Sequence, residues 1–263
     1  MSAPAAEVLL EVEGAVATLT LNDTARRNVM TPELGDALCA RVAELKGRDD
    51  VRAVVLTGAG GAFSAGGDLK MLERLRQVSF EDARAFMLGF YARYLSVLDL
   101  PVPVIAAVDG PAIGAGLCVA LACDVCLVAE DSKLALNFVQ LGLHPGMGAT
   151  YLAPRRAGAQ AAAELLLTGR RFDGKEAVKL GLALEAAPAG QVLTRARELA
   201  GRIAANAPLA VRALKQRLGL DRAELQRALE EEARFQAESY GSQDLGEGLA
   251  AAAARRAPVF QGR

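Results

Sequence analysis

The stretch from Val104 to Asp124, VIAAVDGPAIGAGLCVALACD, predicts a short strand, a turn and the start of a helix. Val104–Val108 carries no charge and is followed by Asp109-Gly110-Pro111, which favours a strand buried on both faces and stopped by a turn. Nearly all later side chains are small, so another backbone or a ligand can approach this helix closely. Its first turn also has N–H groups without intrahelical partners, which makes it a candidate site for an oxyanion or a phosphate.

A second segment has the same pattern. Ala53–Thr57 is an apolar strand, Gly58–Gly67 is the glycine-rich loop GAGGAFSAGG, and Asp68–Leu72 opens a helix. Two such junctions from separate parts of the chain can direct two N–H donors at one oxygen atom. The pair is therefore stronger evidence for an anion site than either junction alone.

Composition excludes several classes of protein. A chain of 263 residues with 52% hydrophobic content can form one α/β domain, or a domain with a helical appendage. The formal net charge of −1 gives no general basic surface for nucleic acid. No apolar run approaches the roughly 20 residues of a membrane span, and the N-terminal segment lacks a basic signal region. We therefore expect a cytoplasmic protein without a nucleic-acid or membrane partner.

The cysteines indicate a reduced protein without a metal site. Cys39, Cys118, Cys123 and Cys126 all lie in apolar surroundings, and the chain has one histidine. Cys123 and Cys126 have CxxC spacing, but no second pair is present to complete a zinc site. We expect buried, reduced thiols and no metal.

Strands alternate with helices in the first part of the chain. We expect a hairpin from Glu7–Glu13 and residues 15–21, a helix capped by Thr31, and further strands at residues 51–57 and at Val125–Ala129. This alternation favours crossover connections and a largely parallel sheet. Beyond His144 the pattern becomes helical, with helices expected at residues 158–167, 174–180, 191–205, 209–218, 223–240 and 245–256.

Five motifs together resemble the crotonase, or enoyl-CoA hydratase/isomerase, family. They occur in the family's order and spacing: Arg27-Asn28, AFSAGGDL at residues 62–69, PVIAAVDGPAIGAG at 103–116, Cys123-Asp124 and LGLHPGMG at 141–148. The resemblance extends over about the whole chain. It implies an α/β fold, with a crotonase-like ββα spiral core over residues 1–190. It also implies a C-terminal helical trimerisation region over residues 191–263, so that the protein forms a homotrimer or a hexamer.

The resemblance also implies a substrate and a site. The backbone N–H groups of Gly67 and Ala115 would hold the thioester carbonyl of an acyl-CoA, whose coenzyme A is part of the substrate, so no separate cofactor is expected. Negative charge builds on that oxygen when an enolate forms, and each preset donor lowers the barrier by about 3 kcal/mol. The implied substrate contacts are Arg27, Val29, Ala65, Asp68, Leu69, Lys70, Gly114, Cys118 and Phe138. Arg27 and Lys70 are candidates for the CoA phosphates, and Cys118 and Phe138 for an apolar wall.

The acid–base groups depart from the family pattern. The hydratases carry glutamates at the positions that match Cys118 and Phe138, and the isomerases commonly place an acid at the position of Gly146. Positioned acid–base catalysis contributes roughly 10²- to 10⁴-fold in rate, so water addition should be impaired unless another group substitutes. The candidate acid–base residues are Asp68 and His144, each of which has a simpler structural interpretation as a helix cap or a loop residue.

The sequence leaves three alternative functions to consider. A nucleotide site is disfavoured because neither loop continues into GK[ST], and the second loop lacks the third glycine of a dinucleotide motif. A thioester hydrolase is suggested by AFSAG around Ser64, followed in hydrolase order by Asp124 and His144. The third is a non-catalytic acyl-CoA-binding homologue that kept the pocket and lost the proton chemistry.

Overall fold

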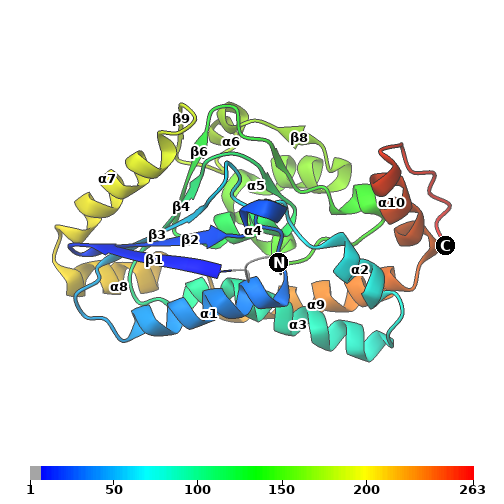
Figure 1. Cartoon of the computed structure of the whole chain (residues 1–263), viewed down its shortest axis with the longest axis horizontal. Helices are drawn as coiled ribbons and strands as arrows, with labels where there is room; N and C mark the ends of the chain where they lie inside the picture. Colours follow the sequence, from blue (N-terminus) through cyan, green and yellow to red (C-terminus); the bar gives the residue numbers. More distant parts are fainter. Residues whose placement is uncertain (1–6) are drawn as a thin grey trace.

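The computed structural model describes residues 7–263, which form a six-stranded sheet in the order β1-β2-β3-β4-β6-β9 (Figure 1). β1 (Glu7–Glu13) and β2 (Val16–Asn22) make the expected antiparallel hairpin. β3 (Ala53–Gly58), β4 (Val104–Val108), β6 (Val125–Ala129) and β9 (Glu185–Ala187) then follow in parallel. The predictions of an α/β fold and of a largely parallel sheet are confirmed.

Both faces of this sheet are covered, because alternate strand residues point to opposite sides. One set, which includes Val55, Ile105 and Leu127, packs against the alanines of α7 (Val192–Ala204). The other set, which includes Val54 and Ala106, packs against the larger core beneath α1 (Pro32–Lys46) and α4 (Ala115–Ala122). Figure 1 shows α7 on one side of the sheet and α1 on the other. The apolar strands are therefore buried on both faces.

The remaining helices extend the larger core. α3 (Phe80–Leu95) and α9 (Arg222–Tyr240) lie side by side. α10 (Gln243–Ala254) packs on the 3-10 turn η3 (Phe138–Leu141) and also contacts α2 (Leu69–Leu75). The other elements are η1 (Thr24–Arg26), η2 (Ser96–Asp99), α5 (Ala149–Thr168), α6 (Gly174–Lys179), α8 (Pro208–Leu218) and a small sheet of β5 (Ala112–Ile113), β7 (Leu134–Ala135) and β8 (Arg171–Phe172).

Local signals placed most helix starts correctly. The Thr31 hydroxyl accepts the N–H of Leu34 at 3.3 Å, and Pro32 occupies the first position of α1, where its missing N–H costs nothing. α5 is the main exception, because it begins at Ala149 and runs through Pro154 before a break in helical geometry at Gly158 (φ 77°). Because of this break, the apolar periodicity predicted only the part of the helix that follows Gly158. Within residues 7–263, every helix is too short or too polar to cross a membrane.

Candidate functional site

The two glycine-rich junctions lie against each other beyond the ends of β3 and β4. The N–H groups of Phe63 and Ser64 donate to the Pro111 carbonyl at 3.0 and 3.1 Å, and the Ile113 N–H donates to the Ser64 carbonyl at 3.1 Å. Gly116 in the first turn of α4 permits this contact, because a Cβ there would lie 2.7 Å from the Ser64 Cβ. Two segments about fifty residues apart are therefore joined by main-chain hydrogen bonds.

Gly67 and Ala115 line the same cavity, and the N–H groups of both residues are unpaired in the described part of the chain. Gly67 follows the first glycine loop, and Ala115 is the first residue of α4, preceded by Gly114 with φ 53° and ψ −119°. Neither N–H has a hydrogen-bond acceptor within residues 7–263. Both residues line a cavity of 650 Å³, so two residues from separate segments bring unpaired donors to the lining of one space. Such a pair can bind an oxygen atom on which negative charge develops.

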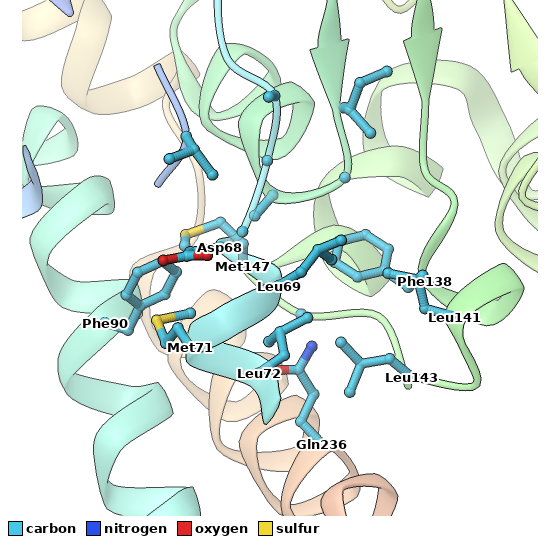
Figure 2. A pocket seen from close by; sticks show the side chains of 18 of the residues that line it. Asp68, Leu69, Met71, Leu72, Phe90, Phe138, Leu141, Leu143, Met147 and Gln236 are labelled. Atoms are coloured by element: carbon cyan, nitrogen blue, oxygen red, sulfur yellow. The ribbon is translucent and has the colours of Figure 1, made fainter. Parts of the chain in front are cut away.

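The cavity is polar at one end and apolar along its walls. Arg26, Asp68 and Lys70 contribute charged side chains. Figure 2 shows Met71, Leu72 and Phe90 on one side of the space and Phe138, Leu141 and Leu143 on the other. The arrangement suits a ligand with a charged part outside and an aliphatic part inside.

Asn28 fixes the loop that carries Arg26 and Val29 to the cavity rim. Its buried amide donates to the carbonyls of Ala59 and Ala62 at 2.9 and 2.8 Å, and its Oδ1 accepts the Asp23 N–H at 2.8 Å. All three bonds tie the loop to itself or to the first glycine junction. Asn28 therefore stabilises the loop beside the cavity and does not line the cavity itself.

Most of the residues expected at the site line this cavity. They are Val29, Ala65, Gly67, Asp68, Leu69, Lys70, Gly114, Ala115 and Phe138. The Asp68 side chain also accepts the Lys70 N–H at 2.9 Å, so the expected cap of α2 is confirmed.

Three expected residues lie elsewhere. Arg27 adopts a left-handed conformation (φ 55°) at the end of η1, which leaves Arg26 at the cavity in its place. Cys118 lies one turn inside α4 and is fully buried, and burial raises the pKa of its thiol well above the ordinary value. Its position does not provide the expected wall beside a ligand.

His144 is also away from the cavity. Its ring stacks on Phe235 with centroids 4.8 Å apart, and its Nδ1 lies 2.7 Å from the Pro145 carbonyl oxygen. Burial lowers the pKa of this imidazole. The histidine lines a different, shallow depression, so the expectation that it reaches the substrate is not supported by its position.

The residues of the hydrolase alternative are committed to other contacts. Buried Ser64 donates its hydroxyl to the Asn28 carbonyl at 2.8 Å and accepts the Gly66 N–H at 3.2 Å. Asp124 accepts the Val104 N–H at 2.7 Å and pairs with Lys215 at 2.6 Å. Without a histidine beside Ser64, no base is in place to activate it.

Sequence reasoning found Phe138 but missed the rest of the apolar walls and the base of the cavity. The missed residues are Met71, Leu72, Met87, Phe90, Tyr91, Ile113, Asn137, Leu141, Leu143, Met147, Gln236 and Ala252. One signal was available for Gln236, because it falls with Leu225, Leu229 and Tyr240 on the buried stripe of α9. A polar residue on such a stripe requires a partner or a function.

Glu232 lies one helical turn before Gln236 and is also buried. Its carboxylate accepts the N–H of Gly148 at 2.6 Å, and the N–H and hydroxyl of Thr150 at 2.8 and 2.6 Å. These donors belong to the N-terminal end of α5 and favour the ionised form. Burial opposes them and raises the Glu232 pKa from 4.5 to about 7.

We expect Glu232 to make stability depend on pH. The folded protein binds a proton on Glu232 more tightly than the unfolded chain does. The contribution of Glu232 to the free energy of unfolding should therefore be highest below pH 4.5 and should fall by about 3 kcal/mol as the pH rises to 7. Glu232→Gln removes the titration, so the stability lost on substitution should be larger at pH 5 than at pH 8. Urea unfolding of both proteins at each pH measures this, with exposed Glu231→Gln as the control. A stability difference that does not change with pH would contradict the assignment.

Comparison with known proteins gives a consistent result. The family model for enoyl-CoA hydratase/isomerase matches residues 11–263. The chain is 44% identical over 193 residues to the Mycobacterium tuberculosis protein named "Probable enoyl-CoA hydratase EchA14", covering 73% of each. It is 39% identical over 214 residues to the Mycosarcoma maydis protein named enoyl-CoA isomerase/hydratase fer4, covering 81% of this chain and 77% of that one. The structure of EchA1_1 from Mycobacterium paratuberculosis superposes with a TM-score of 0.86 at 33% identity, covering 100% of both chains.

Proposed function

The chain belongs to the enoyl-CoA hydratase/isomerase family, whose members act on acyl-CoA, and from this premise we propose that Gly67 and Ala115 hold an acyl-CoA thioester through their N–H groups. The observation that carries the proposal is the pair of unpaired donors on one cavity. The acyl chain would then lie between the apolar walls, and the nucleotide would extend toward Arg26 and Lys70. The free donors form the oxyanion hole of the proposed site.

The chemistry that such a site supports is enolate formation. When a nucleophile adds to the β-carbon of a 2-enoyl thioester, the double-bond electrons move toward the carbonyl oxygen. The same charge develops there when a proton leaves the α-carbon. Main-chain donors that are already in place stabilise this charge without reorganising during the reaction. They need no functional side chain, which agrees with glycine and alanine at the two positions.

Proton transfer falls to Asp68 in this proposal. The positions where the family usually has acids hold Cys118, Phe138 and Gly146, and none of these can exchange a proton with a ligand here. Within residues 7–263, Asp68 is the one carboxylate that lines the cavity. It is partly exposed, directly after Gly67, and keeps one carboxylate oxygen free of the Lys70 cap.

The second candidate function is acyl-CoA binding without turnover. The observation that favours it is the lack of carboxylates along the apolar walls of the cavity. Asp68, the carboxylate that does line the cavity, already serves as the N-cap of α2. Such a protein would keep the free donors and the apolar walls, and would act as a carrier or a regulator. Only a turnover measurement separates the two functions.

Conversion of crotonyl-CoA tests the proposal. We expect the absorbance of the conjugated thioester to fall in the presence of the protein, and the rate to drop about 10²-fold in Asp68→Asn, because an amide cannot carry the proton. Asparagine also caps helices well, so the fold should survive. Calorimetry with saturated butanoyl-CoA provides the control, and its affinity should be unchanged. Binding without turnover would select the carrier, whereas absence of binding would contradict both functions.

Lys70 gives a second test, directed at the nucleotide. The side chain is exposed on the cavity and has no salt bridge within residues 7–263. Lys70→Ala should weaken the binding of butanoyl-CoA by up to about fivefold at low salt, because an exposed charge pair contributes up to about 1 kcal/mol and is screened by salt. Butanoyl-pantetheine, which lacks the nucleotide, should bind both proteins equally. Lys46→Ala, on the exposed end of α1, is the matched control, and an equal loss in that variant would contradict the contact.

A homotrimer or hexamer is part of the proposal. In support, α8 has no buried residue in the isolated chain and exposes Leu209, Leu214 and Leu218. Exposed apolar residues grouped on one helix are typical of protein interfaces. Light scattering would give the molar mass, and a monomer at micromolar concentration would contradict this assembly.

A further inference from the structure

Two buried polar side chains form the base of the cavity between α3 and α9. Tyr91 and Gln236 are 1% and 2% exposed, and both line the cavity. The Tyr91 hydroxyl donates to Gln236 Oε1 at 2.9 Å, and Gln236 Nε2 donates to the His144 carbonyl at 2.8 Å. These contacts fix the amide orientation, because a flipped amide would set its oxygen against the His144 carbonyl oxygen.

The hydrogen bond to His144 uses one of the two N–H groups of Gln236 Nε2, and the second has no acceptor within residues 7–263. Figure 2 shows the amide nitrogen pointing between Leu72 and Leu143, toward the cavity. A buried donor left without a partner costs about 1 to 3 kcal/mol, and native structures rarely keep one. A ligand that brings an acceptor to this point would satisfy it.

Gly146 keeps the pair uncovered. A Cβ at this position would lie 2.5 Å from Gln236 Nε2 and 2.6 Å from the Tyr91 hydroxyl oxygen. Any side chain at residue 146 would therefore displace the amide and the phenol or cover them. The glycine therefore leaves the amide and the phenol uncovered at the base of the cavity.

We propose that the substrate's acyl chain carries a neutral oxygen, a hydroxyl or a keto group, on its fourth carbon or beyond, and that Gln236 donates a hydrogen bond to this oxygen. The inference rests on the proposed function and specifies its substrate class. A carboxylate is disfavoured, because the cations that line the cavity, Arg26 and Lys70, belong to the exposed segments near its entrance. Tyr91 acts as a positioning residue that orients the amide.

Tyr91 and Gln236 act in binding and take no part in proton transfer. Burial raises the pKa of Tyr91 well above its ordinary value of 10, and its proton is directed at Gln236 rather than into the cavity. The amide of Gln236 does not titrate. The base of the cavity therefore selects a substrate by hydrogen bonding and leaves proton transfer to other groups.

Calorimetry with matched acyl-CoA ligands tests the proposal. The probes are butanoyl- and pentanoyl-CoA, butanoyl-CoA with a hydroxyl group on its fourth carbon, and pentanoyl-CoA with a hydroxyl group on its fourth or fifth carbon or a keto group on its fourth. At least one oxygenated chain should bind the unmodified protein about tenfold more tightly than its parent chain. Gln236→Leu should abolish this preference, so that the oxygenated and parent chains bind the variant with equal affinity.

A double variant separates binding from folding. Gln236→Leu alone leaves the Tyr91 hydroxyl without its acceptor, whereas Tyr91→Phe with Gln236→Leu removes that hydroxyl as well and should restore part of the stability. Loss of the preference in both variants supports the inference. Equal affinity for plain and oxygenated chains, or a preference that survives both variants, overturns it and leaves the proposed function standing. Failure of every acyl-CoA to bind overturns both.

Discussion

Replacing Ala115 by proline is expected to lower crotonyl-CoA turnover by about 10²- to 10³-fold, the usual cost of one lost oxyanion donor. Ala115 is the first residue of α4, and proline is well tolerated at that position because the first N–H of a helix has no intrahelical acceptor. The substitution removes the donor and places a ring carbon where its hydrogen pointed. The helix should persist while the site loses one of its two donors.

Ala115→Gly is the matched control, because it also changes the side chain but keeps the N–H. We expect its turnover to remain within about threefold of the unmodified protein, with both variants folded by circular dichroism. A readout that does not require turnover is the enolate absorbance of acetoacetyl-CoA on the protein, which should be reduced in the proline variant alone. Equal activity of the proline and glycine variants would show that this N–H does not act on the substrate.

Gly116→Ala is expected to lower the free energy of unfolding by about 1 to 3 kcal/mol and to weaken butanoyl-CoA binding at least tenfold. The new Cβ would lie 2.7 Å from the Ser64 Cβ and 2.8 Å from its hydroxyl oxygen. Ser64 cannot easily yield, because its hydroxyl is bonded to the Asn28 carbonyl and its own carbonyl accepts the Ile113 N–H. The two junctions should therefore separate, and their donors should no longer face one oxygen.

Gly201→Ala in α7 is the control for this substitution. A Cβ at residue 201 meets nothing within 4 Å, so alanine should leave stability unchanged or raise it by up to about 1 kcal/mol through helix propensity. Urea unfolding and calorimetry on both variants measure the two effects. A Gly116→Ala protein as stable and as tight-binding as Gly201→Ala would show that the close approach of the junctions is not required.

The two junctions could be predicted because each is a local pattern. An apolar strand, a glycine-rich turn and a helix start follow one another within the 17 residues of Ala53–Leu69, and the same order recurs within the 19 residues of Val104–Ala122. Parallel pairing of β3 with β4 then brings the two carboxyl ends to the same edge of the sheet. Short-range sequence therefore sufficed for the backbone at the candidate site.

The base and walls of the cavity depend on tertiary packing that local patterns do not encode. Tyr91 and Gln236 are 145 positions apart and meet only because α3 and α9 lie side by side. β9 is three residues long and shows no periodicity of its own. The error over Arg27 has a local cause, because a left-handed residue turned its neighbour Arg26 toward the cavity instead. His144 stacks on Phe235 of α9 and lines a different depression from the cavity.

A crystal structure of the protein with butanoyl-CoA tests the central claim most directly, since this saturated thioester cannot be consumed by hydration. The carbonyl oxygen should lie about 2.7 to 3.1 Å from the main-chain nitrogens of both Gly67 and Ala115. A thioester oxygen bonded to any other group, or more than about 4 Å from either nitrogen, would contradict the account.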